Sequence, residues 1–223
     1  MVILGLDTTG NTLSVALSED TKILGETSIN DTKKHSETLL PVLNGLLTVL
    51  DRDITEIGLI AVSIGPGSFT GIRIGVATAK GLAHALHVPV AGIDTLDGLL
   101  QNVFFDGTIC AIMDARRSQV YAAAKNGNNV LVPSCAIELG KLLTMLGEGP
   151  VLFVGDGIDS YKETIANHRP DSIFAAPPVR YQRASSVCTL GFLKSLKGDV
   201  LEYCQVRANY LRPSQAERLK RNV

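Results

Sequence analysis

GPGSFTGIRIGVATAKGLAHAL, residues 65–86, joins a strand to a helix through a glycine-rich turn. An apolar run at residues 59–64 leads into it, and the glycines together with Pro66 end that strand. Ser68 or Thr70 can then cap a helix, whose free backbone N–H groups favour an anion or a close backbone partner. The stretch therefore predicts a strand, a turn and a helix in direct succession.

The predicted helix carries an apolar seam with small residues between its members. The seam recurs at spacings of four and three and consists of Ile72, Val76, Ala79, Ala83 and Leu86. An interior glycine costs a helix about 1 kcal/mol relative to alanine, so Gly71, Gly75 and Gly81 need a compensating reason. Close approach of another backbone is the simplest one. The helix is either a tightly packed core helix or one that offers a small-residue face to another protein, and we favour the second interpretation.

Length and composition fit one large domain or two small lobes with a substantial core. The chain has 223 residues, 45% of them hydrophobic, and a net charge of −1, which predicts no strong binding to nucleic acid or anionic membrane by the chain alone. Its four cysteines form no C-x-x-C pair, which favours the reducing cytoplasm over a disulfide framework. We expect no signal peptide and no membrane span.

The predicted elements repeat once along the chain. Three short strands followed by alternating helices and strands make a first block, and a second block from about residue 108 has the same order. Asp7, after the first strand, corresponds to Asp114, and the glycine turn at residues 65–67 corresponds to that at residues 155–157. The pattern predicts a duplicated chain.

We therefore predict two lobes, each with a mixed sheet flanked by helices. The first spans residues 1–104 and carries the partner-binding helices, and the second, smaller lobe spans residues 105–212. Residues 213–223 are expected to form a helical tail that packs back on the first lobe. This organisation resembles the bilobal fold of actin-like ATPases, sugar kinases and Hsp70 proteins (the ASKHA fold), in which the turn after the first strand of each lobe faces nucleotide phosphates.

Asp7-Thr8-Thr9 resembles the first phosphate loop of that superfamily. Asp7 could hold a water of a Mg²⁺ ion, and a threonine hydroxyl could bind a phosphate. A turn that only closes a hairpin explains the same residues equally well.

The glycine turn at residues 65–75 fails the common phosphate and nucleophile templates. Thr70 stands where both G-x-x-x-x-G-K-[ST] and G-x-G-x-x-G need a glycine, and Pro66 stands where G-x-S-x-G needs one. His35 does not begin a metal-binding H-x-x-x-H pair, because Leu39 stands four residues after it, and the sequence has no H-E-x-x-H. We predict no catalytic residue and no metal site. The predicted vestigial phosphate loop consists of Asp7, Thr8, Thr9, Gly65 and Gly67.

Several motifs together resemble the TsaB family, also called YeaZ. They are Asp7-Thr8-Thr9, His35-Ser36-Glu37 with Leu39-Leu40-Pro41, residues 65–75, and Asp114-Ala115-Arg116 with Val120-Tyr121. The resemblance is strong from residue 1 to about residue 125. Beyond that it rests on lobe pattern and on Asn209-Tyr210-Leu211-Arg212.

The resemblance implies a partner role in tRNA modification. TsaD, a paralogue of TsaB, transfers a threonylcarbamoyl group to the adenosine beside the tRNA anticodon, and TsaB is the non-catalytic subunit that dimerises with it, joined by the ATPase TsaE. It implies tRNA contact only through the complex, a homodimer when TsaD is absent, and no cofactor except an adenine nucleotide at the TsaD interface. The family was once labelled glycoprotease-like, but this sequence has no metal or nucleophile pattern of a protease.

Two helix seams are predicted to meet the partner's counterparts in a four-helix interface. The predicted interface residues are His35, Glu37, Leu39, Leu43, Leu46, Ile72, Arg73, Val76, Ala79 and Ala83. Helix initiation remains an alternative for His35 and Glu37, and a solvated side chain remains one for Arg73. The second lobe has Arg116 and Arg117 where a nucleotide site usually has glycine; they bind an anion, have only a surface role or pair with a carboxylate. The main alternative function is a stand-alone ATP-binding phosphotransferase or ATPase, which needs both phosphate loops.

Overall fold

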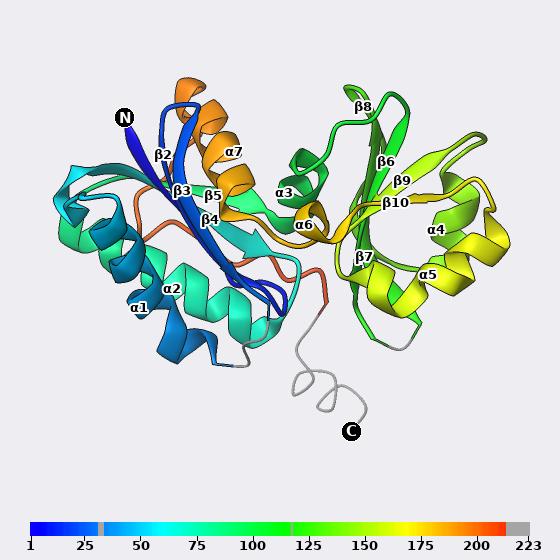
Figure 1. Ribbon diagram of the computed structural model, residues 1–223, viewed down its shortest axis with the longest axis horizontal. Helices are drawn as coiled ribbons and strands as arrows, with labels where there is room; N and C mark the ends of the chain where they lie inside the picture. Colours follow the sequence, from blue (N-terminus) through cyan, green and yellow to red (C-terminus); the bar gives the residue numbers. More distant parts are fainter. Residues whose placement is uncertain (31–33, 117, 213–223) are drawn as a thin grey trace.

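The protein is described by a computed structural model over residues 1–30, 34–116 and 118–212. Two lobes lie side by side and the chain crosses between them near the middle (Figure 1). Arg117 and the tail at residues 213–223 lie outside the described residues. Within the described part, no helix is long and apolar enough to cross a membrane.

The first lobe is built on a five-stranded sheet with the order β3-β2-β1-β4-β5. Its strands are β1 (Val2–Asp7), β2 (Leu13–Glu19), β3 (Lys22–Ile29), β4 (Ile57–Gly65) and β5 (Val90–Asp94). β1 pairs antiparallel with β2, placing Leu4 opposite Leu17, and parallel with β4, placing Leu4 opposite Ile60. Both faces of β1 and β4 are covered, which explains their almost continuous apolar sequences.

The second sheet repeats the first strand by strand. Its strands are β6 (Thr108–Asp114), β7 (Gln119–Asn126), β8 (Asn129–Glu138), β9 (Val151–Val154) and β10 (Ile173–Phe174). Their order is β10-β9-β6-β7-β8, which matches the first sheet position for position. Gly65, the last residue of β4, and Gly155, the residue after β9, stand at equivalent turns. Their φ angles are positive, at 116° and 108°. The predicted duplicated, bilobal α/β fold with mixed sheets is confirmed.

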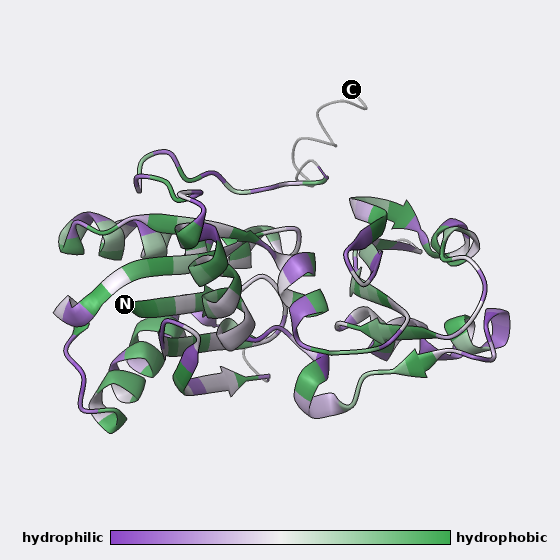
Figure 2. Ribbon diagram, turned by 90° about the horizontal axis from the view of Figure 1, so that it is seen from above, coloured by the Kyte–Doolittle hydropathy of each residue, from purple (hydrophilic) through white to green (hydrophobic). Residues whose placement is uncertain are grey.

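One face of each sheet is covered by two helices of its own lobe. They are α1 (His35–Val49) and α2 (Phe69–Leu86) in the first lobe, and α4 (Leu139–Met145) and α5 (Gly157–His168) in the second. A short 3₁₀ turn, η1 (Ile54–Glu56), precedes β4. Hydrophobic residues lie on both the strands and the helices of each lobe (Figure 2).

The opposite faces are covered by helices that the lobes exchange. α3 (Thr95–Gln101) follows the first sheet, yet Leu96, Leu99 and Leu100 are buried against the second. α7 (Ala184–Leu196) follows β10 and the short α6 (Pro177–Arg180), yet it packs on the first sheet. The fit is close: a Cβ at Gly191 would lie 2.5 Å from the Cβ of Ala61.

The predicted boundary of the second lobe is therefore wrong at its C-terminal end. Residues from Ala184 to Arg212, assigned to the second lobe from the sequence, return to the first. The physical reason is that the first sheet has an apolar face left bare by α1 and α2, and α7 covers it. Asn102 links the two segments that connect the lobes, one after α3 and one before α7. Its side chain donates to the carbonyls of Val179 (3.2 Å) and Tyr181 (2.7 Å).

After α7 the chain forms a C-terminal strap, residues 199–212, along the first lobe (Figure 2). Leu201 pairs with Val90 at the sheet edge, and Val206 is buried in the first core. The backbone N–H of Asn209 donates to the Ile64 carbonyl at 2.7 Å. Arg212 Nη1 then donates to the Ala115 carbonyl of the second lobe at 2.6 Å, so the strap connects both lobes.

Candidate functional site

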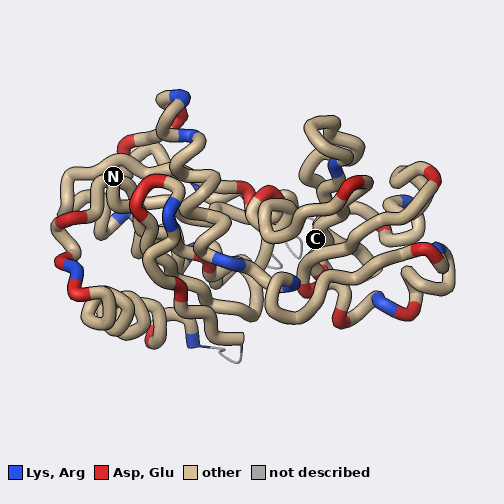
Figure 3. Tube along the Cα trace, turned by 45° about the horizontal axis from the view of Figure 1, so that its top comes forward, with Lys and Arg blue, Asp and Glu red and all other residues tan. Residues whose placement is uncertain are grey.

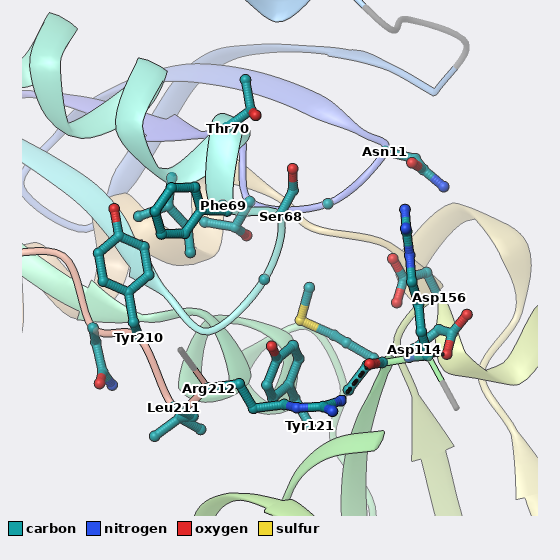
Figure 4. A pocket seen from close by; sticks show the side chains of 18 residues that line it. Asn11, Ser68, Phe69, Thr70, Asp114, Tyr121, Asp156, Tyr210, Leu211 and Arg212 are labelled. Atoms are coloured by element: carbon teal, nitrogen blue, oxygen red, sulfur yellow. Dashed lines mark hydrogen bonds between the residues drawn. The ribbon is translucent and has the colours of Figure 1, made fainter. Parts of the chain in front are cut away.

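A polar cavity of about 500 Å³ lies between the lobes. The turn after β1, the N-terminus of α2, the turns after β6 and β9 and the strap all contribute to its wall (Figure 4). The lining includes Asn11, Ser68, Phe69, Thr70, Asp114, Arg116, Tyr121, Asp156, Tyr210, Leu211 and Arg212. This is the cleft where the sequence predicted two facing phosphate loops.

The first predicted loop uses its polar groups within the chain. Asp7 is buried, and one carboxylate oxygen accepts from the Thr9 backbone N–H (2.8 Å) and hydroxyl (2.7 Å), while the other accepts from the Ser63 hydroxyl. The Thr8 hydroxyl donates to the Gly71 carbonyl at 2.7 Å. Burial raises the pKa of Asp7, although the hydrogen bonds from Ser63 and Thr9 oppose that rise. The geometry is that of the turn alternative, with no hydroxyl or carboxylate left for a phosphate or a metal-bound water.

The glycines of the turn and helix admit this loop. A Cβ at Gly67 would lie 2.3 Å from the Thr9 carbonyl oxygen, and one at Gly71 only 2.0 Å from that of Thr8. A Cβ at Gly65 would meet the Asn209 carbonyl oxygen at 2.3 Å. The close backbone partner predicted from the sequence exists, but it belongs to this chain. Our interpretation of these glycines as a face offered to another protein is therefore wrong for residues 65–75.

The apolar members of the predicted interface lie in the core of the first lobe. None is more than 8% exposed: Leu39, Leu43, Leu46, Ile72, Val76, Ala79 and Ala83. These side chains cannot contact a partner directly. Each helix has one apolar stripe, and that stripe packs against the sheet of its own lobe. This corrects the expectation that the seams themselves meet a partner.

The three polar members of the predicted interface have different environments. His35 is buried, with Nε2 3.0 Å from the Gly10 carbonyl oxygen. Glu37 is exposed and pairs with Lys34 at 3.2 Å. Arg73 is exposed and lies 3.9 Å over the Phe69 ring, while its Nε donates to the Tyr210 hydroxyl at 3.2 Å. Arg73 therefore joins α2 to the strap.

The outward face of α2 is the part of the predicted small-residue face that stays exposed, whereas the exposed residues of α1 were not selected from the sequence. Val49 of α1 is 82% exposed and Leu40 is 52% exposed. On α2 the exposed residues include Ala77, Gly81 and Ala85, and a Cβ at Gly81 would meet nothing within 4 Å. Their spacing of four was visible in the sequence as the gaps between seam positions.

The second lobe contributes two aspartates to the cavity. Asp114 is exposed and accepts from the Arg116 backbone N–H (2.7 Å) and the Tyr161 hydroxyl (3.2 Å). Asp156 has a buried Oδ1 without a hydrogen-bond partner in the described structure. Burial raises the pKa of Asp156 to about 7; a hydrogen bond from the Asp114 backbone opposes that rise, and the charges of Asp159, Asp114 and Asp7 add to it. Sequence analysis did not select Asp156, although the repeated glycine turn at residues 155–157 was a signal for it.

Metal binding and a basic surface find little support in the described residues. No group of three or more His, Cys, Asp or Glu side chains there is arranged to hold a metal ion. Figure 3 shows lysine and arginine positions interspersed with aspartate and glutamate along both lobes. A nucleic acid would therefore meet alternating charge rather than a continuous basic stripe.

Comparison with known proteins gives the family. The model of the TsaD family, described as tRNA N6-adenosine threonylcarbamoyltransferase, matches residues 22–217. The Bacillus subtilis tRNA threonylcarbamoyladenosine biosynthesis protein TsaB is 34% identical over 97% of this chain and 96% of its own length. A Pseudomonas aeruginosa protein described as similar to peptidase YEAZ superposes with a TM-score of 0.81 at 25% identity, covering 95% of this chain and 99% of its own.

A more distant structure shows the fold alone. The ROK hexokinase of Thermus thermophilus superposes with a TM-score of 0.53 at 11% identity, covering 88% of this chain and all of that chain. It agrees with the ASKHA architecture expected from the duplicated lobes. Together with the full-length match to a curated relative, this architecture places the chain in the TsaB (YeaZ) family of tRNA threonylcarbamoyladenosine biosynthesis proteins.

Proposed function

We propose that this chain is a non-catalytic subunit that binds and activates a TsaD-type threonylcarbamoyltransferase. TsaE is the expected third component, and tRNA is contacted only through the complex. The setting is the cytoplasm, and the chain needs no cofactor of its own. An adenine nucleotide at the TsaD interface, and a homodimer through the same surface when TsaD is absent, remain predictions of the family resemblance.

The closed first loop is the observation that carries this proposal. A phosphotransferase of this fold needs a carboxylate and hydroxyls free to meet the metal and the phosphates. Here Asp7 accepts hydrogen bonds from Ser63 and Thr9, and Thr8 is bonded to Gly71. Breaking these hydrogen bonds would leave their buried partner groups unsatisfied, at a cost of about 1–3 kcal/mol each. This argues against the stand-alone ATPase alternative.

The outward faces of α1 and α2 are the proposed docking surface for TsaD. Leu40 and Val49 expose apolar area, and the exposed Ala77, Gly81 and Ala85 let another helix approach closely. A partner of related fold, with the same two helices, would complete a four-helix contact. The buried seams then support this surface from below.

The test is a reconstituted modification assay with unmodified tRNA, TsaD, TsaE and threonylcarbamoyl-AMP. We expect threonylcarbamoyladenosine, measured by mass spectrometry of the nucleosides, to form only when this chain is present. Modification at an unchanged rate without the chain would contradict the proposal. Calorimetry with Mg-ATP tests the alternative, which requires binding and turnover by the isolated chain that are lost in Asp7→Asn.

A matched pair of variants tests the surface. Gly81→Arg adds a long side chain to α2 where a Cβ has open space, and Gly140→Arg does the same on α4 of the other lobe. We expect only Gly81→Arg to abolish co-purification with TsaD, with both variants folded by circular dichroism. Equal binding by both would remove α2 from the interface.

A further inference from the structure

The C-terminal strap lies along one side of α2. Tyr203 packs on His84 near the end of the helix, with ring centroids 4.6 Å apart, and Tyr210 packs on Phe69 at its start, at 4.7 Å. The strap therefore runs antiparallel to α2, along a line that we call the α2–strap border. α1 lies on the other side of α2, because it packs over β2 and β3, whereas the strap pairs with β5 at the opposite sheet edge.

Two cations of this border converge on one oxygen atom. Lys80 Nζ of α2 donates to the Val206 carbonyl at 3.3 Å, and Arg207 Nη1 of the strap donates to the same carbonyl at 3.1 Å. Within residues 1–30, 34–116 and 118–212, neither side chain forms an ion pair. Two like charges held this close repel each other, so the geometry favours an anion beside them.

A third cation extends the same border toward the start of α2. Arg73 precedes Lys80 by seven residues, about two turns of helix, and so lies on the same side. Its Nε donates to the Tyr210 hydroxyl at 3.2 Å, and it has no carboxylate partner in the described part of the chain. The whole chain has a net charge of −1, so this run of uncompensated positive charge is local.

A hollow of about 500 Å³ opens at the C-terminal end of the α2–strap border. His84, Pro89, Leu201 and Tyr203 are among its lining residues. Leu201 is 39% exposed and Tyr203 is 36% exposed, so the hollow offers apolar and aromatic surface beside the cations. The side chains that contribute most to protein–protein binding commonly fill such pockets. A partner that fits here carries an apolar side chain as well as negative charge.

We propose that the α2–strap border binds an acidic segment of the TsaD-type partner. A carboxylate would lie between Lys80 and Arg207, and an apolar side chain would enter the hollow. The inference rests on the proposed function: Gly81 of the proposed docking surface directly follows Lys80, so one partner can cover both. A nucleic acid fits less well, because Glu202 also lines the hollow and would repel phosphates.

Charge reversal at the border is the first test. With TsaD of the same organism, Lys80→Glu and Arg207→Glu should each raise the Kd measured by calorimetry at least about tenfold. Lys141→Glu is the matched control, since it makes the same charge change at an exposed position on α4 of the second lobe. It should change the Kd by less than about twofold. Added salt should weaken binding by the wild type more than by Lys80→Glu.

The hollow is tested by removing its aromatic ring. Tyr203→Ala should raise the Kd for TsaD about tenfold, whereas Tyr203→Phe, which keeps the ring, should bind like the wild type. Phe104→Ala removes a ring that is 96% exposed and lies outside the hollow, and should have no effect.

Hydrogen exchange shows whether the strap stays in place in the variants. The N–H groups of Leu201 and Asn209 donate to the carbonyls of Val90 and Ile64 at 2.9 and 2.7 Å. Their exchange should remain as slow in each variant as in the wild type.

The outcomes separate this inference from the proposed function. A wild-type chain without affinity for TsaD, or normal binding by Gly81→Arg, would overturn the docking surface and this inference with it. Loss of binding in Gly81→Arg but not in Lys80→Glu and Arg207→Glu would overturn only the inference. So would an equal loss in Lys141→Glu, or a loss of tRNA binding at unchanged TsaD affinity. Normal binding by Tyr203→Ala would exclude the hollow as an anchor.

Discussion

The two lobes share one strand order but differ in the loop that follows their first strand. After β1, Asp7 is buried and receives three hydrogen bonds from Ser63 and Thr9. After β6, Asp114 is exposed, and its side chain accepts hydrogen bonds from the Arg116 backbone N–H and the Tyr161 hydroxyl. Both loops border the cavity, but the aspartate of the first is part of the core, whereas the aspartate of the second lines the cavity.

This difference shows how a duplicated fold can separate structure from binding. In the first lobe the helix N-terminus and the loop pack so closely that Gly71 has no room for a Cβ. In the second lobe the turn after β9 is equally close at Gly155, where a Cβ would lie 2.1 Å from the Ile112 carbonyl oxygen, but looser at Gly157, where it would lie 3.0 Å from Ile112. Asp114 and Asp156 of the second lobe line the cavity, whereas Asp7 of the first lobe does not.

The largest expected effect contrasts the two glycine contacts. Gly71→Ala forces a Cβ against the Thr8 carbonyl oxygen, at 2.0 Å in the present geometry, and should lower the free energy of unfolding by about 3 kcal/mol. Gly157→Ala should cost about 1 kcal/mol, because its neighbours need to move by only a few tenths of an ångström. Chemical denaturation measures both.

Gly81→Ala is the control for helix propensity. With open space around its Cβ, it should raise the free energy of unfolding by up to about 1 kcal/mol. Equal losses in Gly71→Ala and Gly157→Ala would break the contrast between a closed and an open loop.

A pH dependence of stability follows from Asp156. Its pKa is about 7 in the folded chain and 3.8 as a reference value, so between these values the unfolded chain binds fewer protons. Stability should then fall as the pH rises through this window, by about 2 kcal/mol after discounting for water at the cavity. Asp156→Asn should remove this contribution, so its stability advantage over the wild type should grow from pH 4 to pH 7.

Denaturation of the wild type and Asp156→Asn at several pH values between these limits measures that difference. A constant difference across the window would show that Asp156 ionises in the folded chain as freely as in the unfolded one. Asp114→Asn is the comparison within the same lobe, since no buried orphaned oxygen is involved there.

The smallest effect compares the two loop aspartates directly. Asp7→Asn replaces one accepting oxygen by a donor facing Thr9 or Ser63, so the free energy of unfolding should fall by about 1 kcal/mol. Asp114→Asn, at an exposed position, should change it by less than about 0.5 kcal/mol. Thermal unfolding at neutral pH suffices, and matching losses would mean that both loops contribute equally to stability.

The sequence predicted the fold because the repeated pattern is local. Strand, turn and helix signals recur in both blocks, and Asp7 and Asp114 do end equivalent strands. The return of α7 to the first sheet was missed because an apolar stripe shows that a helix is buried and not which sheet buries it.

The candidate site was predictable only in part, for the same reason. Periodicity identified Ile72 and Ala79 as one seam but could not say whether a partner or the lobe's own sheet covers it. The requirement for Gly71 depends on the Thr8 carbonyl, 63 residues away in the chain. Asp156 becomes notable only when the other elements leave its oxygen without a donor.

The exchange of α3 and α7 makes the lobes dependent on each other during synthesis. When the ribosome has completed the first sheet, one apolar face stays bare until α7, at Ala184–Leu196, has emerged. The second sheet, by contrast, finds α3 already made. A nascent chain therefore completes its C-terminal lobe first, and a gene cut between the lobes would yield two halves, each exposing a face that only the other can cover.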